Sequence, residues 1–319
     1  MERKNSSSSK SISVVIPVTE WGRSDSATDI HREYTAALDG LDITYEMIYV
    51  LDGPFQKVRE HLDRLRADGE VLTIIQLGKH FGESAALEAG LANSTGDWVL
   101  TLPAYYQFEP EQLERLFDDT DGWDMLVGRR HPRIDSKINQ WLSSVFHTLV
   151  NWMTGSNFHD LSSGTRLIRR DVLADIPLYG DQHRFLPVLA SRKGYRVTEV
   201  NLAQSAKENF RRLPKLGVYP RRLLDLLTVF FLVKFTKKPL RFFGLIGAGA
   251  ASLGGFWTLF LVFERLFFGQ ALAQRPALLL AALLIVLGVQ IFALGLIGEI
   301  VIYAHAREIR EYTIEEIVN

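Results

Sequence analysis

The sequence contains no cysteine, so disulfides and thiolate metal sites are excluded. It carries 36 Lys and Arg against 37 Asp and Glu, and a net charge of −1 gives no overall attraction to nucleic acid. The N-terminus holds charges and the serines Ser6–Ser9 but no apolar core, so we expect no signal peptide there. These features favour a cytosol-facing protein that does not bind nucleic acid.

Charge is also missing from two long stretches near the C-terminus. Phe242–Phe263 is an uncharged run of 22 residues, and Ala277–Gly298 is another. Because a helix needs roughly 20 apolar residues to cross a bilayer, we predict two transmembrane helices. The alternative is a buried core hairpin. Four glycines in the first run suit close helix packing in lipid: Gly247, Gly249, Gly254 and Gly255.

Basic residues around these runs predict the orientation. Ten Lys or Arg lie between Lys207 and Arg241, whereas the connecting loop, residues 264–276, has only Arg265 and Arg275. Two more arginines follow the second run. Lys and Arg are enriched in the cytosolic segments of membrane proteins. We therefore expect a multi-pass protein of the cell (inner) membrane with its main domain and both termini in the cytosol.

Residues 11–130 alternate between β-branched runs and helical patterns. We predict strands at Ser11–Val18, Tyr45–Leu51, Val71–Leu77, Asp97–Leu102 and Asp124–Arg130, with helices at Ala27–Leu38, Phe55–Ala67, Gly82–Ala92 and Glu111–Phe117. This order predicts an α/β fold with a mostly parallel sheet. Ligands bind such sheets beyond the carboxyl ends of the strands. Those ends are residues 17–20, 52–53, 79–82 and 103–107.

The rest of the chain predicts a path to the membrane. We expect a long helix at Ser136–Thr154, then a polar loop, and a helix and strand through Leu202. Arg221–Phe235 is apolar with basic ends and is predicted to lie on the membrane surface; an ordinary core helix is the alternative. The expected divisions are a disordered segment 1–10, a cytosolic domain 11–206, a basic juxtamembrane segment 207–241, the two membrane helices 242–303 and a cytosolic tail 304–319.

Several segments together resemble one family. They are SVVIPV (13–18), GKHFGESAALEAGL (78–91), GDWVLTL (96–102) followed by Gln107 and a Pro-Glu pair, VGRR (127–130), HDLSSGTRLIRRDV (159–172), HRFLPVLASRKGYRVTEV (183–200) and GLIGEI (295–300). In this order and spacing the chain resembles the family-2 glycosyltransferases, specifically the polyprenyl-phosphate sugar transferases typified by dolichol-phosphate mannose synthase. The resemblance covers roughly residues 11–303.

The resemblance implies a nucleotide-sugar-binding α/β domain with membrane helices appended. It also implies an inverting reaction that moves a sugar from a nucleotide donor to the phosphate of a long isoprenoid lipid. The expected partners are therefore the nucleotide sugar, the polyprenyl phosphate, the membrane, and a second copy or a partner subunit. A site at the bilayer surface with basic residues suits an acceptor of this kind.

Site residues follow from the same resemblance. It assigns the donor to Pro17, Thr19, Asp52, Lys79, His80, Gly82 and His183. The helix start after Gly82 offers free N–H groups to a diphosphate. Three positions depart from the family: Leu51 stands in place of an aspartate, Pro54 in place of a serine, and Thr19-Glu20 in place of Tyr-Asn. Each donor candidate also has a structural alternative. Asp52 would be a simple turn aspartate, Pro17 and Thr19 would belong to a plain loop, and Phe81 would pack at a capped helix start.

Asp160 and Arg166 are the catalytic candidates. Asp160 matches the family's base or orienting acid, and Arg166 matches an arginine that either neutralises a phosphate or pairs with Asp160. Arg129, Arg211, Arg212 and Lys215 are candidates for the acceptor phosphate or for lipid headgroups. A solvated charge run is the alternative for the last three.

The family's metal motif is replaced here. Where the family has Asp-Ala-Asp to hold Mg²⁺ or Mn²⁺, this chain has Pro103-Ala104-Tyr105. Hard cations need oxygen ligands, and neither replacement supplies a good one. We therefore expect no metal ligands in this motif and leave the cofactor unassigned. Three outcomes remain: metal-free transfer with Lys79, Arg129 or Arg130 in the cation's role, ligands borrowed from Asp52 or Asp160, or an inactive membrane subunit that serves as scaffold or lipid binder. A lipid-phosphate carrier is a weaker fourth.

Overall fold

The computed structural model describes residues 10–19, 27–118, 120–134, 140, 143–144, 147–148, 150–151, 155–176, 180–207, 239–269 and 276–305. The chain forms two compact units that divide near residue 230. The first contains the α/β domain, and the second contains a pair of long helices. Each unit is described by itself.

The α/β domain is built on a seven-stranded sheet in the order β3-β2-β1-β4-β6-β5-β7. Its strands are β1 (Lys10–Val18), β2 (Ile43–Leu51), β3 (Leu72–Gln76), β4 (Trp98–Thr101), β5 (Met125–Arg130), β6 (Arg166–Arg169) and β7 (Val197–Leu202). Only β6 runs against its two neighbours, and the other pairings are parallel. The prediction of a mostly parallel α/β sheet is confirmed.

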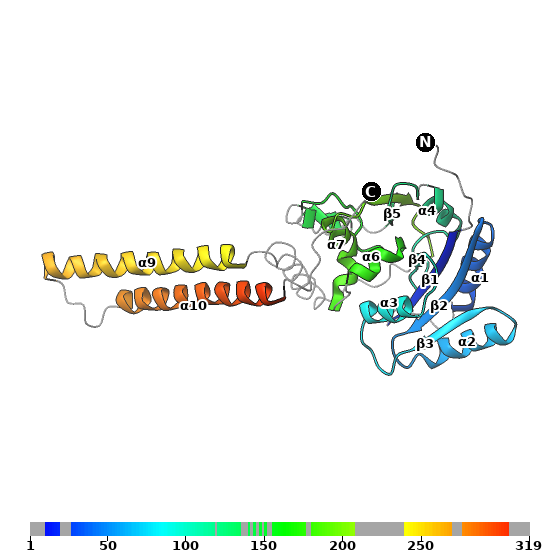
Figure 1. Ribbon diagram of the computed structural model, residues 1–319, viewed down its shortest axis with the longest axis horizontal. Coiled ribbons are helices and arrows are strands. Elements are labelled where there is room, and N and C mark those ends of the chain that lie inside the picture. Colours follow the sequence, from blue (N-terminus) through cyan, green and yellow to red (C-terminus); the bar gives the residue numbers. More distant parts are fainter. Residues whose placement is uncertain are drawn as a thin grey trace, which may run out of the picture. The chain divides into compact units, whose positions relative to one another are not determined.

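Helices cover both faces of this sheet (Figure 1). They are α1 (Ala27–Asp39), α2 (Gln56–Ala67), α3 (Glu83–Ala92), the 3₁₀ turn η2 (Pro110–Leu113), α4 (Glu114–Asp118), α6 (Arg170–Asp175), η3 (Gly180–Phe185) and α7 (Leu186–Arg192). Side chains alternate between the faces of a strand, and β1 shows this directly. Ile12, Val14 and Ile16 pack with α1 and α2, whereas Val15 packs with α3, α6 and α7.

The strand directions bring distant loops together. The loops after β1, β2, β3, β4 and β5 leave the sheet at its carboxyl edge. Because β6 is antiparallel, its first residue lies at that same edge, where Arg166 pairs with Thr101 of β4. The loop before β6, residues 159–165, therefore meets the loop after β4. Ligands of parallel sheets bind at this edge.

Most predicted strands and helices lie within one or two residues of their observed positions. The predictions missed β6, which lies inside the segment predicted as a polar loop. Lys10, assigned to a disordered segment, is the first residue of β1. The surface helix at Arg221–Phe235 lies outside the described residues, as do most of the helix at Ser136–Thr154 and residues 306–319 of the tail.

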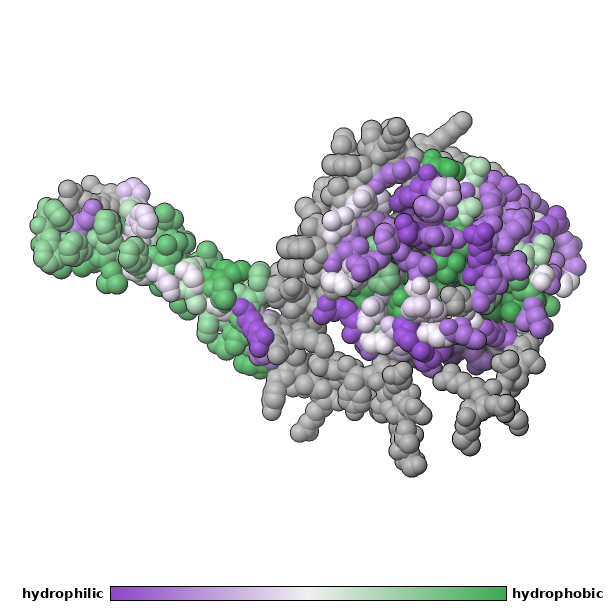
Figure 2. Space-filling model, turned by 90° about the horizontal axis from the view of Figure 1, so that it is seen from above, coloured by the Kyte–Doolittle hydropathy of each residue, from purple (hydrophilic) through white to green (hydrophobic). Residues whose placement is uncertain are grey.

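The second unit is a pair of helices, α9 (Pro239–Phe268) and α10 (Pro276–His305), of 30 residues each. Both are long and apolar enough to cross a membrane. Only 17% of the most apolar stretch of α9 and 11% of that of α10 are buried. Figure 2 shows their surface as predominantly hydrophobic and the described surface of the α/β domain as mostly hydrophilic. The loop predicted to start at residue 264 starts later, because α9 continues through Phe268.

Glycine sets the contact between α9 and α10. A Cβ on Gly247 would lie 2.5 Å from the carbonyl oxygen of Gly288, and one on Gly254 would lie 2.6 Å from that of Ala281. These positions recur every seven residues on each helix, so they share one face. The predicted packing role is confirmed for Gly247 and Gly254. Gly249 and Gly255 take no part in this contact, since no atom of the described residues lies within 4 Å of their Cβ positions.

Candidate functional site

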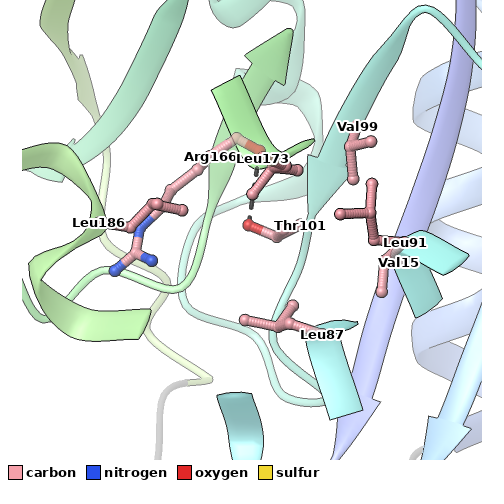
Figure 3. A pocket seen from close by; sticks show the side chains of 8 residues that line it. All are labelled: Val15, Leu87, Leu91, Val99, Thr101, Arg166, Leu173 and Leu186. Atoms are coloured by element: carbon pink, nitrogen blue, oxygen red, sulfur yellow. Dashed lines mark hydrogen bonds between the residues drawn. The ribbon is translucent and has the colours of Figure 1, made fainter. Parts of the chain in front are cut away.

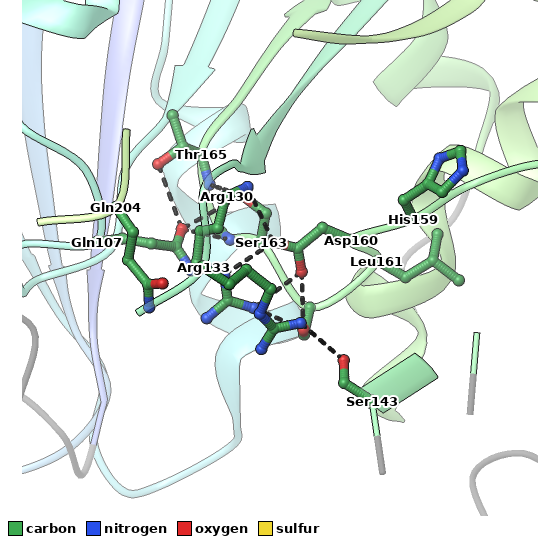
Figure 4. A network of polar contacts seen from close by, with 12 residues as sticks. Gln107, Arg130, Arg133, Ser143, His159, Asp160, Leu161, Ser163, Thr165 and Gln204 are labelled. Carbon is green, nitrogen blue, oxygen red and sulfur yellow. Dashed lines mark hydrogen bonds and ion pairs between the residues drawn. The ribbon is translucent and has the colours of Figure 1, made fainter. Parts of the chain in front are cut away.

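A buried ion pair lies at the carboxyl edge of the sheet, between the end of β5 and the loop before β6. Arg130 donates from Nε to Asp160 Oδ2 at 2.7 Å and from Nη2 to Oδ1 at 2.8 Å. Its backbone N–H also donates to Oδ2. Both residues are buried, with 9% and 1% of their surfaces exposed. Figure 4 shows Arg133 beside this pair.

This geometry decides the charge of Asp160. Burial raises the pKa of its carboxyl group, but the hydrogen bonds and charge of Arg130, together with Arg133, hold that pKa at about 2. A carboxylate with so low a pKa is a weak general base at neutral pH. Of the two roles left open for Arg166, pairing with Asp160 is not observed; the partner of Asp160 is Arg130. Arg130 therefore uses its Nε and Nη2 donors for Asp160, although the sequence also suggested it as a replacement for the metal.

A second carboxylate holds the loop that carries Asp160. Glu199 of β7 accepts hydrogen bonds from the backbone N–H groups of His159 and Asp160, at 2.7 and 2.9 Å. His147 Nε2 accepts the N–H of Leu161, and burial lowers the pKa of this imidazole. The loop before β6 is therefore fixed at both its backbone and its side chains.

The loop after β4, which replaces the family's metal motif, is joined directly to the loop before β6. Gln107 is 1% exposed, and its Oε1 accepts from Ser163 Oγ at 3.2 Å and from Gly164 N at 3.0 Å. Thr101 Oγ1 donates to the carbonyl of Gly164 at 2.7 Å. A Cβ on Gly164 would lie 3.5 Å from the side chain of Pro103.

These residues do not fit a divalent cation. Pro103 has no ligand atom, the phenol of Tyr105 is a weak ligand for a hard cation, and the side-chain oxygen of Gln107 already accepts several hydrogen bonds. No group of three or more His, Asp or Glu that could hold a metal occurs in the part of the chain that the structure describes.

Asp52 follows β2 and is almost fully buried, with 3% of its surface exposed. Its carboxylate accepts from the backbone N–H of Phe81 at 2.7 Å and from that of Gly82 at 3.0 Å. The Asp52 carboxylate therefore accepts two N–H groups just before α3. The sequence had predicted that N–H groups here are free to bind a diphosphate. His80 lies across Gly53 and is 4.0 Å from Asp52 Oδ2.

Arg166 and His183 meet beneath the edge, on the α3 side of the sheet. The Arg166 guanidinium donates to the carbonyls of His183 and Leu161, while its Nε has no partner among the described residues. Burial lowers its pKa to about 10. Figure 3 shows this side chain beside a small apolar cavity lined by Thr101 and Leu186.

Both ring nitrogens of His183 are engaged. Nδ1 lies 3.0 Å from Ser84 Oγ, and Nε2 lies 3.2 Å from Glu83. Burial raises the pKa of Glu83, but the hydrogen bond and charge of His183, followed by the charge of Arg166, bring it below its ordinary value. His183 therefore braces η3 against the first turn of α3.

The remaining predicted residues have simpler surroundings. Pro17 is buried at the end of β1, and Thr19 follows it at the carboxyl edge. Lys79 is exposed, with its Nζ 5.1 Å from the ring centroid of Phe81. Arg129 is half-buried on β5. Arg211, Arg212 and Lys215 lie outside the described residues.

Sequence reasoning missed the roles of Gln107 and Glu199. A signal for Gln107 was present, because the residue follows the altered motif as the resemblance predicts. The resemblance gave it no role of its own. Glu199 had no such signal, since a glutamate inside a strand predicts no contact with a loop 39 residues earlier.

Comparisons with known proteins agree with this architecture. The family model described as glycosyl transferase family 2 matches residues 13–176. The chain is 32% identical over 312 residues to the undecaprenyl-phosphate 4-deoxy-4-formamido-L-arabinose transferase of Pseudomonas aeruginosa, covering 96% of this chain and 90% of that protein. It is 27% identical over 311 residues to the dodecaprenyl-phosphate galacturonate synthase of Rhizobium johnstonii, covering 93% and 89%.

Among solved structures, glucosyl-3-phosphoglycerate synthase from Mycobacterium tuberculosis matches with a TM-score of 0.54 and 20% identity, covering 69% of this chain and 79% of that one. Mannosyl-3-phosphoglycerate synthase from Rubrobacter xylanophilus matches with a TM-score of 0.54 and 16% identity, covering 69% and 73%. At this identity the structural matches establish the fold of the α/β domain and no more.

Proposed function

Because this chain belongs to glycosyl transferase family 2, we propose that it transfers a sugar from a nucleotide-sugar donor to a polyprenyl phosphate. The observation that carries the proposal is the extent of the similarity. Relatives named as polyprenyl-phosphate transferases match over more than nine-tenths of the chain, including both apolar helices. An acceptor with a long isoprenoid tail needs a protein at the membrane, which the helix pair provides.

The proposed reaction needs little proton transfer. An oxygen of the lipid phosphate forms a bond to the anomeric carbon, and the bond from that carbon to the donor diphosphate breaks, so the nucleoside diphosphate leaves with the electron pair. A phosphate monoester is already ionised at neutral pH. The low pKa of Asp160 suits this chemistry, since no strong base is required.

We assign Asp160 a positioning role through Arg130. The carboxylate fixes the guanidinium in one orientation at the edge where substrates bind, and Arg133 adds a second positive charge nearby. Two guanidinium groups suit a phosphate acceptor, because planar N–H donors pair with its oxygens. Arg129 remains a proposed contact for the acceptor or for lipid headgroups, as do three basic residues outside the described part of the chain: Arg211, Arg212 and Lys215.

The donor is proposed to lie over the ends of β1, β2 and β3. Pro17, Thr19, Lys79 and His80 would border it. Asp52 and Gly82 would shape the pocket through the loop that they hold together. Arg166 and His183 would support this pocket from below, because their polar atoms face the protein interior rather than the edge.

The membrane arrangement is also proposed. The chain is a membrane protein with two candidate spans, and the basic residues between Lys207 and Arg241 favour a cytosolic α/β domain with both termini on that side. We propose the divisions 1–10, 11–206, 207–241, 242–303 and 304–319 as predicted, except that Lys10 belongs to β1 and the helix pair runs from Pro239 to His305. Assembly with a second copy or a partner subunit is proposed to use the outer faces of the helix pair.

Transfer of labelled sugar into lipid tests the proposal. Purified full-length protein in liposomes would be given undecaprenyl phosphate and a panel of radiolabelled UDP- and GDP-sugars. We expect label in the organic phase with one donor. Arg130→Gln should lower the rate at least tenfold, whereas Arg66→Gln, at the far end of α2, should leave it unchanged. Absence of labelled lipid with every donor, from folded protein, would favour an inactive membrane subunit, which the relatives' names do not support.

A further inference from the structure

We infer that this chain binds its nucleotide-sugar donor without a divalent cation, because the oxygen atoms that could hold one are already committed to hydrogen bonds. The inference rests on the proposed function and concerns how that function is carried out. The altered motif leaves metal-free transfer, borrowed metal ligands or an inactive subunit. The hydrogen-bond partners of the candidate ligand oxygens distinguish the first two.

The motif itself offers no cation site. A Cβ on Gly164 would lie 3.5 Å from the Pro103 side chain, so the first position places an apolar ring on the side that this glycine leaves open. Tyr105 contributes a phenol, which binds Mg²⁺ or Mn²⁺ weakly compared with a carboxylate. Gln107 Oε1 accepts from Ser163, Gly164 and Thr165. The two loops are therefore joined by direct protein contacts.

Borrowed ligands are equally committed. Asp52 uses one carboxylate oxygen for the N–H of Phe81 and the other for the N–H of Gly82. Asp160 accepts three hydrogen bonds from Arg130 and one from Ser162 Oγ. A cation at Asp160 would displace the Arg130 guanidinium, which is 9% exposed, and leave it buried without a partner. A cation at Asp52 would displace the part-buried N–H groups of Phe81 and Gly82.

The positive charge for the leaving diphosphate then has to come from the chain. Arg130 is paired with Asp160 and is proposed to face the acceptor phosphate, so it is not assigned to the leaving diphosphate. Lys79 and Arg184 are exposed and lie on the two segments that meet the first turn of α3. Asp52 holds the N–H groups of Phe81 and Gly82 just before this helix, and Gly82 itself supplies no side-chain cap to its first turn. Helix N-termini favour anions, so these two cations lie where a diphosphate would be stabilised.

Binding of nucleotides and of Mn²⁺ to the detergent-purified full chain tests the inference. UDP and GDP would be titrated calorimetrically in Mn²⁺ and in EDTA, and free Mn²⁺ would be followed by electron paramagnetic resonance. We expect one nucleotide to bind with dissociation constants that agree within twofold in the two buffers. We also expect the protein to leave the free Mn²⁺ signal unchanged, with or without that nucleotide.

Variants sharpen the test. Lys79→Gln and Arg184→Gln should each weaken nucleotide binding about tenfold, and Arg66→Gln should not. The double variant Pro103→Asp with Tyr105→Asp should gain Mn²⁺ binding and serves as a positive control for the resonance signal. Nucleotide binding that is lost in EDTA, or stoichiometric Mn²⁺ binding by the unmodified chain, would overturn the inference and keep the proposed function. Failure of every nucleotide to bind in both buffers would instead contradict the proposed function, and the inference with it.

Discussion

Replacing Asp160 with asparagine should unfold the α/β domain at a much lower temperature. The change removes the charge opposite Arg130 and leaves a guanidinium that is 9% exposed facing a neutral amide. Breaking a buried ion pair by removing one partner costs roughly 3–5 kcal/mol. The pKa of Asp160 gives a similar scale, because a fall from the ordinary value of 3.8 to about 2 corresponds to roughly 2–3 kcal/mol.

This free energy predicts a measurable shift. For a domain of about 200 residues, each kcal/mol changes Tm by roughly 2–4 °C, so we expect Asp160→Asn to lower it by about 6–20 °C. Because the pKa is lowered on folding, the stabilisation is present above pH 3.8 and is lost as the pH falls from there through about 2. The shift should therefore be the same at pH 6 and pH 8.

Tryptophan fluorescence during heating would measure this shift. Asp171→Asn is the matched control, because Asp171 pairs with Arg169 at 3.2 Å but is 71% exposed, and exposed pairs contribute roughly 0–1 kcal/mol. Combining Asp160→Asn with Arg130→Met should cost less than the sum of the two single changes, since the uncompensated charge is gone. The reasoning would be refuted by a Tm for Asp160→Asn within 2 °C of the unmodified chain, or by additive effects in the double variant.

Three other changes give separate tests. Gly247→Leu should weaken the helix pair by about 1–3 kcal/mol, because its Cβ would meet the carbonyl oxygen of Gly288 at 2.5 Å; helicity should be lost at a lower SDS fraction, and equal behaviour of Gly249→Leu would argue against the glycine contact. Asp52→Ala should cost about 1–3 kcal/mol for each of two orphaned backbone N–H groups and weaken nucleotide binding in calorimetry; unchanged binding and Tm would contradict its role. Gln107→Leu should lower Tm and the transfer rate, with partial recovery in Gln107→Glu; a Leu variant of normal rate would show that the two loops need no such link.

The fold was largely predictable because its signals are long and repeated. Strands β1 and β2 are runs rich in apolar and β-branched residues, and the two candidate membrane spans contain uncharged runs of the required length. β6 was missed because it has four residues and follows a polar loop. The end of α9 was misplaced because the helix continues past the end of the uncharged run, through Glu264 and Arg265 to Phe268.

The candidate site was predictable as a set of residues but not as a set of contacts. Sequence identifies Asp160 and several arginines near it, yet it cannot say which arginine pairs with it. The pairing follows from geometry: Arg130 ends β5 beside the loop of Asp160, whereas the Arg166 side chain extends to the carbonyl of His183. Likewise, Asp52 was identified, but its role in holding the start of α3 depends on backbone N–H groups that no motif encodes.

The most direct test of the account is a product balance for the purified full-length chain in EDTA. Release of nucleoside diphosphate and formation of lipid-linked sugar would be measured together, with and without undecaprenyl phosphate. The account predicts that the two products appear in equal amounts and only when the lipid phosphate is present. Release of nucleoside diphosphate without the lipid, or no release with any donor whether Mn²⁺ or EDTA is present, would contradict it.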